Sequence, residues 1–96
     1  MSKQTQDAIR RVSQEMCDLL IAKNEAYGDS ALNPARIFSK SGPTEQILVR
    51  IDDKLSRLQN GHSYPGDNEV DDLIGYLILL KIANERHNED NGSAKK

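Results

Sequence analysis

The sequence predicts an all-α fold: a three-helix subunit with a long ordered loop, assembling into an oligomeric helical bundle. Three observations support this prediction. Apolar residues recur at three- and four-residue steps in the segments at about 5–25, 43–59 and 67–86. Gly, Pro, Asn and Ser gather between these segments, as is typical of loops. The last segment is apolar on every side, which indicates a helix buried by more than its own chain.

The first segment, about 5–25, carries one apolar stripe with charged residues on its other side. Neither Pro nor Gly interrupts it before Gly28. The stripe contains Ile9, Val12, Met16 and Leu19. The following residues, 27–42, are polar and rich in turn-forming residues, but they include Leu32, Ile37 and Phe38. Loops of this length are functional or disordered, and the apolar residues favour an ordered loop docked on the helices.

The second segment, about 43–59, begins with Pro43, which suits the first helical turn because its missing N–H has no intrahelical partner there. Asn60-Gly61 ends it. Its predicted apolar stripe consists of Ile47, Leu48, Ile51, Leu55 and Leu58.

The third segment, about 67–86, differs from the other two. Its first turn is acidic, as the helix dipole favours, and apolar residues then surround its axis from Val70 to Ile82. Two helices of one chain cannot enclose such a helix, so we expect a homo-oligomer, a dimer or a tetramer. Residues 1–88 form a single domain in this interpretation, and residues 89–96 form a polar, frayed tail.

Composition narrows the class of protein further. The chain has 96 residues, 13 Lys and Arg against 15 Asp and Glu, and a net charge of −2, which disfavours binding to duplex nucleic acid. No apolar run is long enough to span a membrane, and the N-terminal residues show no signal peptide. Cys17 is the single cysteine, which suits a reducing compartment. These features predict a cytoplasmic protein.

Two carboxylates in the third segment form the first candidate site. Glu69, Asp72 and Tyr76 share one helix face at i, i+3 and i+7. Because carboxylates one turn apart on an apolar helix need compensation, a Mg²⁺ or Mn²⁺ ion is one interpretation. The alternative is that Glu69 and Asp71 only decorate the helix start and that Asp72 pairs with a neighbouring Arg.

The second segment offers a charged face containing Arg50, Asp53, Lys54 and Arg57, which we place opposite its apolar stripe. The three cations are suited to phosphates, with Asp53 reaching a metal or orienting an arginine. The alternative is a solvated face held by pairs such as Asp53 with Arg57.

The end of the first segment supplies two more candidates. Tyr27 is suited to stacking on a base and Lys23 to meeting a phosphate. The alternative makes Gly28 a helix C-cap, with Tyr27 covering the last turn.

Together, three phrases resemble a known family. They are KNEAYG at 23–28, RIDDKLSRL at 50–58 and EVDDLIGYL at 69–77. In this order they resemble the phage nucleotide modification associated domain, which is related to the MazG-like all-α nucleoside triphosphate pyrophosphatases. The resemblance covers roughly residues 8–85. It implies a helical bundle across a dimer or tetramer, Mg²⁺ as cofactor, and cleavage of a nucleoside triphosphate into monophosphate and pyrophosphate.

Carried over by position, the resemblance implies a metal site of Glu69 and Asp72, completed by Asp53. Lys23 and Tyr27 match the lysine and tyrosine that end the family's first helix. The chain departs from the pyrophosphatases at one point, because Arg50 stands where their E-x-x-E pair begins, and Asp53 closes that pair. A site with several metals would then need ligands from Glu25, Glu45 or another subunit.

Three functions follow from these patterns. The first is a Mg²⁺-dependent nucleoside triphosphate pyrophosphohydrolase of phage nucleotide metabolism. Asp53, Glu69 and Asp72 would be catalytic, and the nucleotide would meet Lys23, Tyr27, Arg50, Lys54, Arg57 and Tyr76. The second is a non-catalytic phage protein that sequesters nucleotides or cyclic-nucleotide immune signals. The third is a helical assembly protein without a ligand.

Overall fold

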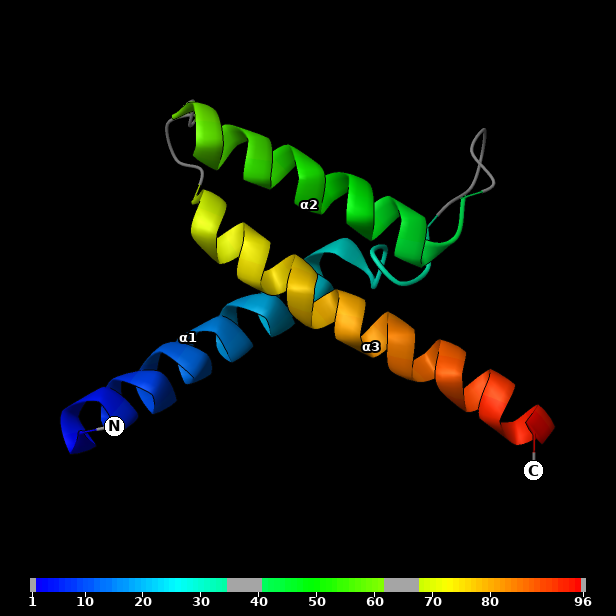
Figure 1. Cartoon of the computed structure of the whole chain (residues 1–96), viewed down its shortest axis with the longest axis horizontal. Coiled ribbons are helices and arrows are strands. Elements are labelled where there is room, and N and C mark those ends of the chain that lie inside the picture. The colour runs from blue at the N-terminus through cyan, green and yellow to red at the C-terminus, as the bar shows by residue number, and fades with distance from the viewer. Residues whose placement is uncertain (1, 35–40, 62–67, 96) are drawn as a thin grey trace.

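A computed structural model describes residues 2–34, 41–61 and 68–95, with side chains up to residue 88. These residues form three helices: α1 (Lys3–Tyr27), α2 (Pro43–Asn60) and α3 (Glu69–Lys95) (Figure 1). The described ranges contain no strand. The predicted all-α class and the three helices are therefore confirmed.

The helix ends follow from local chemistry. The Ser2 side chain accepts a hydrogen bond from the Thr5 N–H at 3.2 Å and caps the start of α1. Gly28 and Gly61 end α1 and α2 in the left-handed conformation, with φ of 65° and 70°, which costs little only at glycine. Pro43 occupies the first turn of α2 as predicted. The interpretation of Gly28 as a C-cap is thus confirmed.

The last helix differs from the prediction at its end. We expected it to stop near residue 86 and residues 89–96 to form a frayed tail, but α3 continues to Lys95. No proline interrupts the chain between Glu69 and Lys95, and proline is the residue that most strongly stops a helix. Polar composition alone therefore did not mark the end of the helix.

A compact turn follows α1. The Asp29 carboxylate accepts hydrogen bonds from the side-chain amides of Asn24 at 2.8 Å and Asn33 at 2.6 Å. Leu32 packs against the core. Of the three residues on which the docked-loop prediction rested, Leu32 is thus docked, whereas Ile37 and Phe38 lie outside the described residues, and a long ordered loop stays a prediction.

The helices form one close pair and one crossing. α2 and α3 run antiparallel and pack along each other. α1 contacts α3 only through the C-terminal part of α1 (Figure 1). The core between α2 and α3 consists of Ile47, Ile51 and Ala83, surrounded by Leu73, Tyr76, Leu79 and Leu80. On α1, Met16 is the buried residue.

Much of the apolar surface stays uncovered in a single copy. On α3, Val70 is 52% exposed and Leu77 is 45% exposed. Of the predicted α2 stripe only Ile47 and Ile51 are buried, and Leu48, Leu55 and Leu58 are exposed. Among the described residues, no helix combines the length and apolar character that a membrane crossing requires. Assembly into an oligomer remains a prediction.

The α2–α3 core makes a stability prediction. Ile47 is 2% exposed, so Ile47→Ala should lower the free energy of unfolding by about 2–4 kcal/mol through lost burial and a residual cavity. Val49→Ala, on the exposed side of the same helix, should change it by less than about 0.5 kcal/mol. Urea titrations followed by circular dichroism measure both. Equal effects of the two variants would contradict this core.

Candidate functional site

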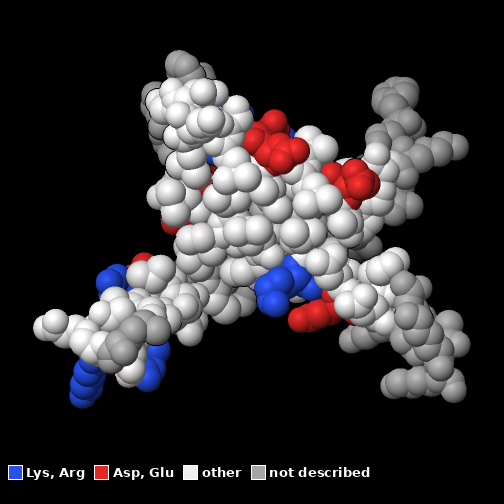
Figure 2. All heavy atoms as spheres, viewed as in Figure 1, with Lys and Arg blue, Asp and Glu red and all other residues white. Residues whose placement is uncertain are grey.

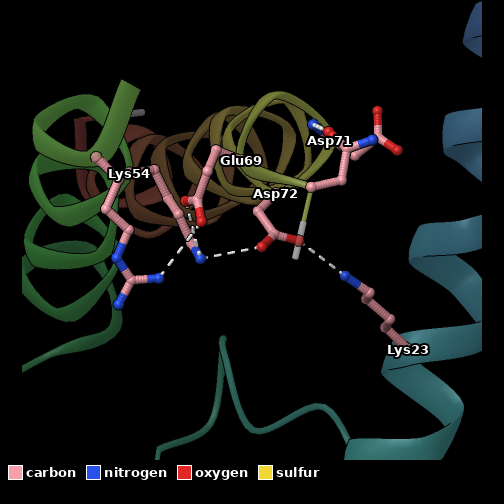
Figure 3. Close-up of polar contacts among 7 residues, drawn as sticks. Lys23, Lys54, Glu69, Asp71 and Asp72 are labelled. Atoms are coloured by element: carbon pink, nitrogen blue, oxygen red, sulfur yellow. Dashed lines mark hydrogen bonds and ion pairs between the residues drawn. The ribbon is translucent and has the colours of Figure 1, made fainter. Parts of the chain in front are cut away.

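A cluster of ion pairs joins the helices beside the core. The Lys54 ammonium lies between two carboxylates of α3, with Nζ 3.4 Å from Glu69 Oε2 and 3.0 Å from Asp72 Oδ2 (Figure 3). The Lys54 side chain is 11% exposed and that of Glu69 is 4% exposed. These charges are therefore nearly removed from water. In this drier environment an ion pair is stronger, but the desolvation of the two charges is also costly.

Asp72 extends the cluster to all three helices. Its second oxygen, Oδ1, accepts from Lys23 Nζ of α1 at 3.0 Å (Figure 3). Arg57 of α2 adds a further cation, with one guanidinium nitrogen 3.5 Å from Glu69 Oε1. One cation of α1 and two cations of α2 thus surround the carboxylates of Glu69 and Asp72, which lie one turn apart on α3.

The position of Lys54 corrects the sequence analysis. We placed Arg50, Lys54 and Arg57 on the side of α2 opposite its apolar stripe. Instead, Lys54 faces α3 and is nearly buried, while Leu48 and Leu55 of the stripe are exposed. The aliphatic stem of a lysine can lie along an apolar surface while its ammonium reaches a partner. The two carboxylates of α3 supply that partner.

The ion pairs govern the proton affinities of two groups. Burial acts to raise the pKa of Asp72, but the bonds from Lys54 and Lys23 outweigh it and hold the pKa below its usual value of 3.8. Burial acts to lower the pKa of Lys54, but its bond to Asp72 and its ion pair with Glu69 keep the pKa above its usual value of 10.5. Both groups are charged in the neutral range.

Glu69 is the least satisfied member of the cluster. Neither of its carboxylate oxygens has a hydrogen-bond partner among the described residues, although both are shielded from water. Its contacts are the longer ion pairs with Lys54 and Arg57, at 3.4 and 3.5 Å. A buried carboxylate with so few bonds is costly, so Glu69 has capacity for a further cation or proton donor.

The predicted metal ligands meet only in part. Glu69 and Asp72 lie together, but Asp53 is exposed and does not join them. Within the described ranges, no three His, Cys, Asp or Glu side chains form a group suited to a metal ion. With Lys54 between the two carboxylates, this arrangement does not fit a Mg²⁺ or Mn²⁺ centre, and the cofactor stays a prediction.

A pocket of about 860 Å³ opens next to the cluster, between the three helices and the turn after α1. Five of the predicted nucleotide-site and metal-site residues line it: Lys23, Tyr27, Arg50, Asp72 and Tyr76. An apolar wall comes from Met16, Leu19, Leu20 and Leu79. Lys54, Arg57 and Glu69 belong to the ion cluster and do not line the pocket, and neither does the exposed Asp53.

Sequence reasoning missed several polar residues of this pocket. Asn24, Asp29, Ser30, Asn68 and Asp71 also line it. Asn24 and Asp71 stand inside the phrases 23–28 and 69–77, so these phrases contained a signal for them. Asp29 reaches the wall through a turn with a φ of 63°, and no spacing rule predicts that.

Arg50 is the cation that this wall leaves available. It is exposed, and it makes no ion pair with the part of the chain that the structure describes. Lys23, by contrast, is already bonded to Asp72. An anionic ligand entering the pocket would therefore find Arg50 without having to displace a carboxylate.

Comparison of the chain with protein-family models, with curated proteins and with solved structures finds no match. The resemblance of the three phrases to the phage domain therefore remains a hypothesis.

The first prediction from the site concerns Lys54. In Lys54→Met the buried Glu69 loses its closest cation, so the free energy of unfolding should fall by about 3 kcal/mol, as when one partner of a buried ion pair is removed. Lys3→Met, at the exposed start of α1, is the control and should change it by less than about 0.5 kcal/mol. Urea unfolding measures both. A Lys54→Met variant as stable as wild type would show that the pairs are not formed.

The second prediction concerns pH. Because the folded pKa of Asp72 lies below its usual value of 3.8, its ionised form stabilises the fold above that pH, and the contribution disappears as pH falls through the folded pKa. The stability difference between wild type and Asp72→Asn should thus be constant from about pH 5 to 9 and shrink below about pH 4. Urea titrations across this range measure it. A difference that grows on acidification would contradict the assignment.

Proposed function

We propose that the protein binds a nucleotide in the pocket between its helices. The observation that carries this proposal is Arg50, an exposed guanidinium that forms no ion pair with the described residues and lies on the wall of a pocket that also presents Tyr27 and Tyr76. Arginine recognises phosphate through paired hydrogen bonds, and tyrosine offers a flat face to a base. The volume of about 860 Å³ falls within the range of ligand pockets.

The three phrases that resemble the phage domain support the same proposal. The pocket takes Lys23 and Tyr27 from the first phrase, Arg50 from the second, and Asp72 and Tyr76 from the third. Phrases far apart in the sequence therefore contribute to one wall. The biological setting that we propose is nucleotide sequestration in the cytoplasm of a bacterium or of a phage-infected host, with cyclic-nucleotide signals among the candidate ligands.

Binding without hydrolysis is the form of the proposal that the geometry favours. Metal-assisted hydrolysis requires carboxylates that are free to hold the ion. Here the Asp72 oxygens are bonded to Lys54 and Lys23, and Lys54 also pairs with Glu69. The carboxylates are thus neutralised by the chain itself. All residues that we assign to this binding site come from a single copy of the chain.

Pyrophosphohydrolysis is the second candidate, and Glu69 is the observation that favours it. Its buried oxygens accept no hydrogen bond from the residues that the structure describes, and an additional cation would compensate them better than the long pairs do. Nucleotide binding that moved Lys54 toward a phosphate would release both carboxylates. In that case Asp72→Asn should abolish monophosphate formation while leaving the helical content unchanged.

One experiment separates the two candidates. Purified protein is titrated calorimetrically with ATP and the deoxynucleoside triphosphates, once with EDTA and once with Mg²⁺, and the ligands are then recovered and chromatographed. We expect binding of at least one nucleotide in EDTA and recovery of the intact triphosphate. Arg50→Gln should weaken that binding at least about tenfold because a charged phosphate contact is lost.

The matched control is Arg10→Gln, which changes the same residue type on the exposed part of α1, away from the pocket. It should leave the affinity unchanged. Recovery of monophosphate and pyrophosphate would establish the hydrolase instead. An absence of binding with and without Mg²⁺, or equal effects of the two arginine variants, would refute nucleotide binding in this pocket.

A further inference from the structure

We propose that Asp71 selects ribonucleotides over 2′-deoxynucleotides by binding the ribose hydroxyls of a ligand in the pocket. This inference rests on the proposed function, which it narrows from nucleotides in general to one class of nucleotide. It concerns recognition of the sugar, whereas Arg50 concerns the phosphate and the two tyrosines concern the base.

Among the described residues three carboxylates line the pocket, and two of them are already occupied. Asp29 uses both oxygens to accept from the side-chain amides of Asn24 and Asn33. Asp72 uses both oxygens to hold two lysines. Asp71 differs, because its carboxylate accepts no hydrogen bond and forms no ion pair within the part of the chain that the structure describes. Its two oxygens are therefore available to a ligand.

The start of α3 holds Asp71 in the pocket wall, apart from the ion cluster. The side-chain oxygen of Asn68 accepts from the backbone N–H of Asp71 at 3.0 Å, and such a capping bond fixes the first helical turn. Adjacent residues of a helix do not face the same way, and Figure 3 shows Asp71 apart from Lys54. The half-buried Asp71 side chain thus belongs to the pocket and not to the cluster.

The rest of the α3 wall offers a ligand little charge. From residue 73 to residue 80 the sequence contains no charged residue. Figure 2 shows few charged side chains over the middle of α3 on the face that it presents. Because Asp72 is neutralised by its lysines, Asp71 is the acceptor that α3 contributes to the recognition of a polar group.

The chemistry of a nucleotide limits what Asp71 can bind. Carboxylate oxygens accept hydrogen bonds and do not donate them, and the anionic phosphates of a nucleotide repel a carboxylate. The 2′ and 3′ hydroxyls of ribose lie on adjacent carbons, so they can donate to the two oxygens of one carboxylate. Acidic side chains bind ribose hydroxyls in this way in dinucleotide-binding folds. A 2′-deoxynucleotide lacks one of the two donors.

The register of α2 and α3 places Asp71 within reach of the same ligand as Arg50. The two helices are antiparallel (Figure 1), and Lys54 of α2 pairs with Asp72 of α3. Arg50 precedes Lys54 by one turn, roughly 6 Å, and therefore lies about one turn beyond Asp72, toward Tyr76. A ribose with its attached phosphate has a similar length, so one nucleotide can contact Asp71 with its sugar and Arg50 with its phosphate.

The test compares each of the four ribonucleoside triphosphates with its 2′-deoxy counterpart, by calorimetric titration of the full chain in EDTA. At least one ribonucleotide should bind about tenfold more tightly than its counterpart, because the 2′-deoxy ligand lacks a hydrogen bond to a charged acceptor. Asp71→Ala should weaken binding of that ribonucleotide about tenfold and leave the affinity for its counterpart unchanged. Asp71→Asn keeps the side-chain shape and one acceptor, so its preference should lie between those of wild type and Asp71→Ala.

Asp52→Ala is the matched control, because Asp52 is an exposed carboxylate of α2 that does not line the pocket. It should leave both affinities unchanged. Equal wild-type affinities for ribonucleotides and their counterparts, with binding still weakened by Arg50→Gln, would overturn this inference and leave the proposed function intact. An Asp71→Ala variant that weakens both members of a pair equally would also overturn it, since contact with the base or a structural role has that effect. An absence of all nucleotide binding would refute the proposed function and this inference with it.

Discussion

The ion pairs of Asp72 hold the arrangement of the helices together. α2 and α3 share an apolar core, but α1 reaches the rest of the chain through a short crossing on α3. At that crossing, one carboxylate of Asp72 accepts from Lys54 of α2 and Lys23 of α1. The position of α1, and with it the shape of the pocket, therefore depends on a charge that must remain ionised.

Burying this cluster is costly, and its geometry indicates what is gained. Apolar residues of similar size would avoid the desolvation of Lys54 and Glu69. Apolar packing of Ile47 and Ile51 alone would also tolerate other rotations of α2, since Leu48, Leu55 and Leu58 offer a second apolar face. Pairing Lys54 with carboxylates at both Glu69 and Asp72 selects one rotation. We infer that the cluster specifies the α2–α3 register more than it adds stability.

The sequence allowed the helices to be predicted but not the rotation of α2. Periodicity, Pro43, Gly28 and Gly61 act locally, and their consequences could be derived from neighbouring residues. The burial of Lys54 arises from residues 15 and 18 positions away, on another helix. The hydrophobic stripe therefore pointed to Leu48 and Leu55, and Asp53 was grouped with carboxylates that it does not meet. The pocket residues Lys23, Tyr27 and Arg50 were predicted from the chemistry of a helix end and of a charged helix face, which are local features of the sequence.

The pocket and the apolar stripe of α1 share part of one helix face. Met16 and Leu19 belong to the α1 stripe and also line the pocket, so a ligand that fills the pocket would cover this part of the stripe. Lys23 lies one further turn along the same face, with its side chain 44% exposed. Excluding water there would strengthen the Lys23–Asp72 pair, because screening by solvent falls as a pair is buried. A bound ligand would then hold α1 more firmly against α3, on the wall where Arg50 remains available to phosphate.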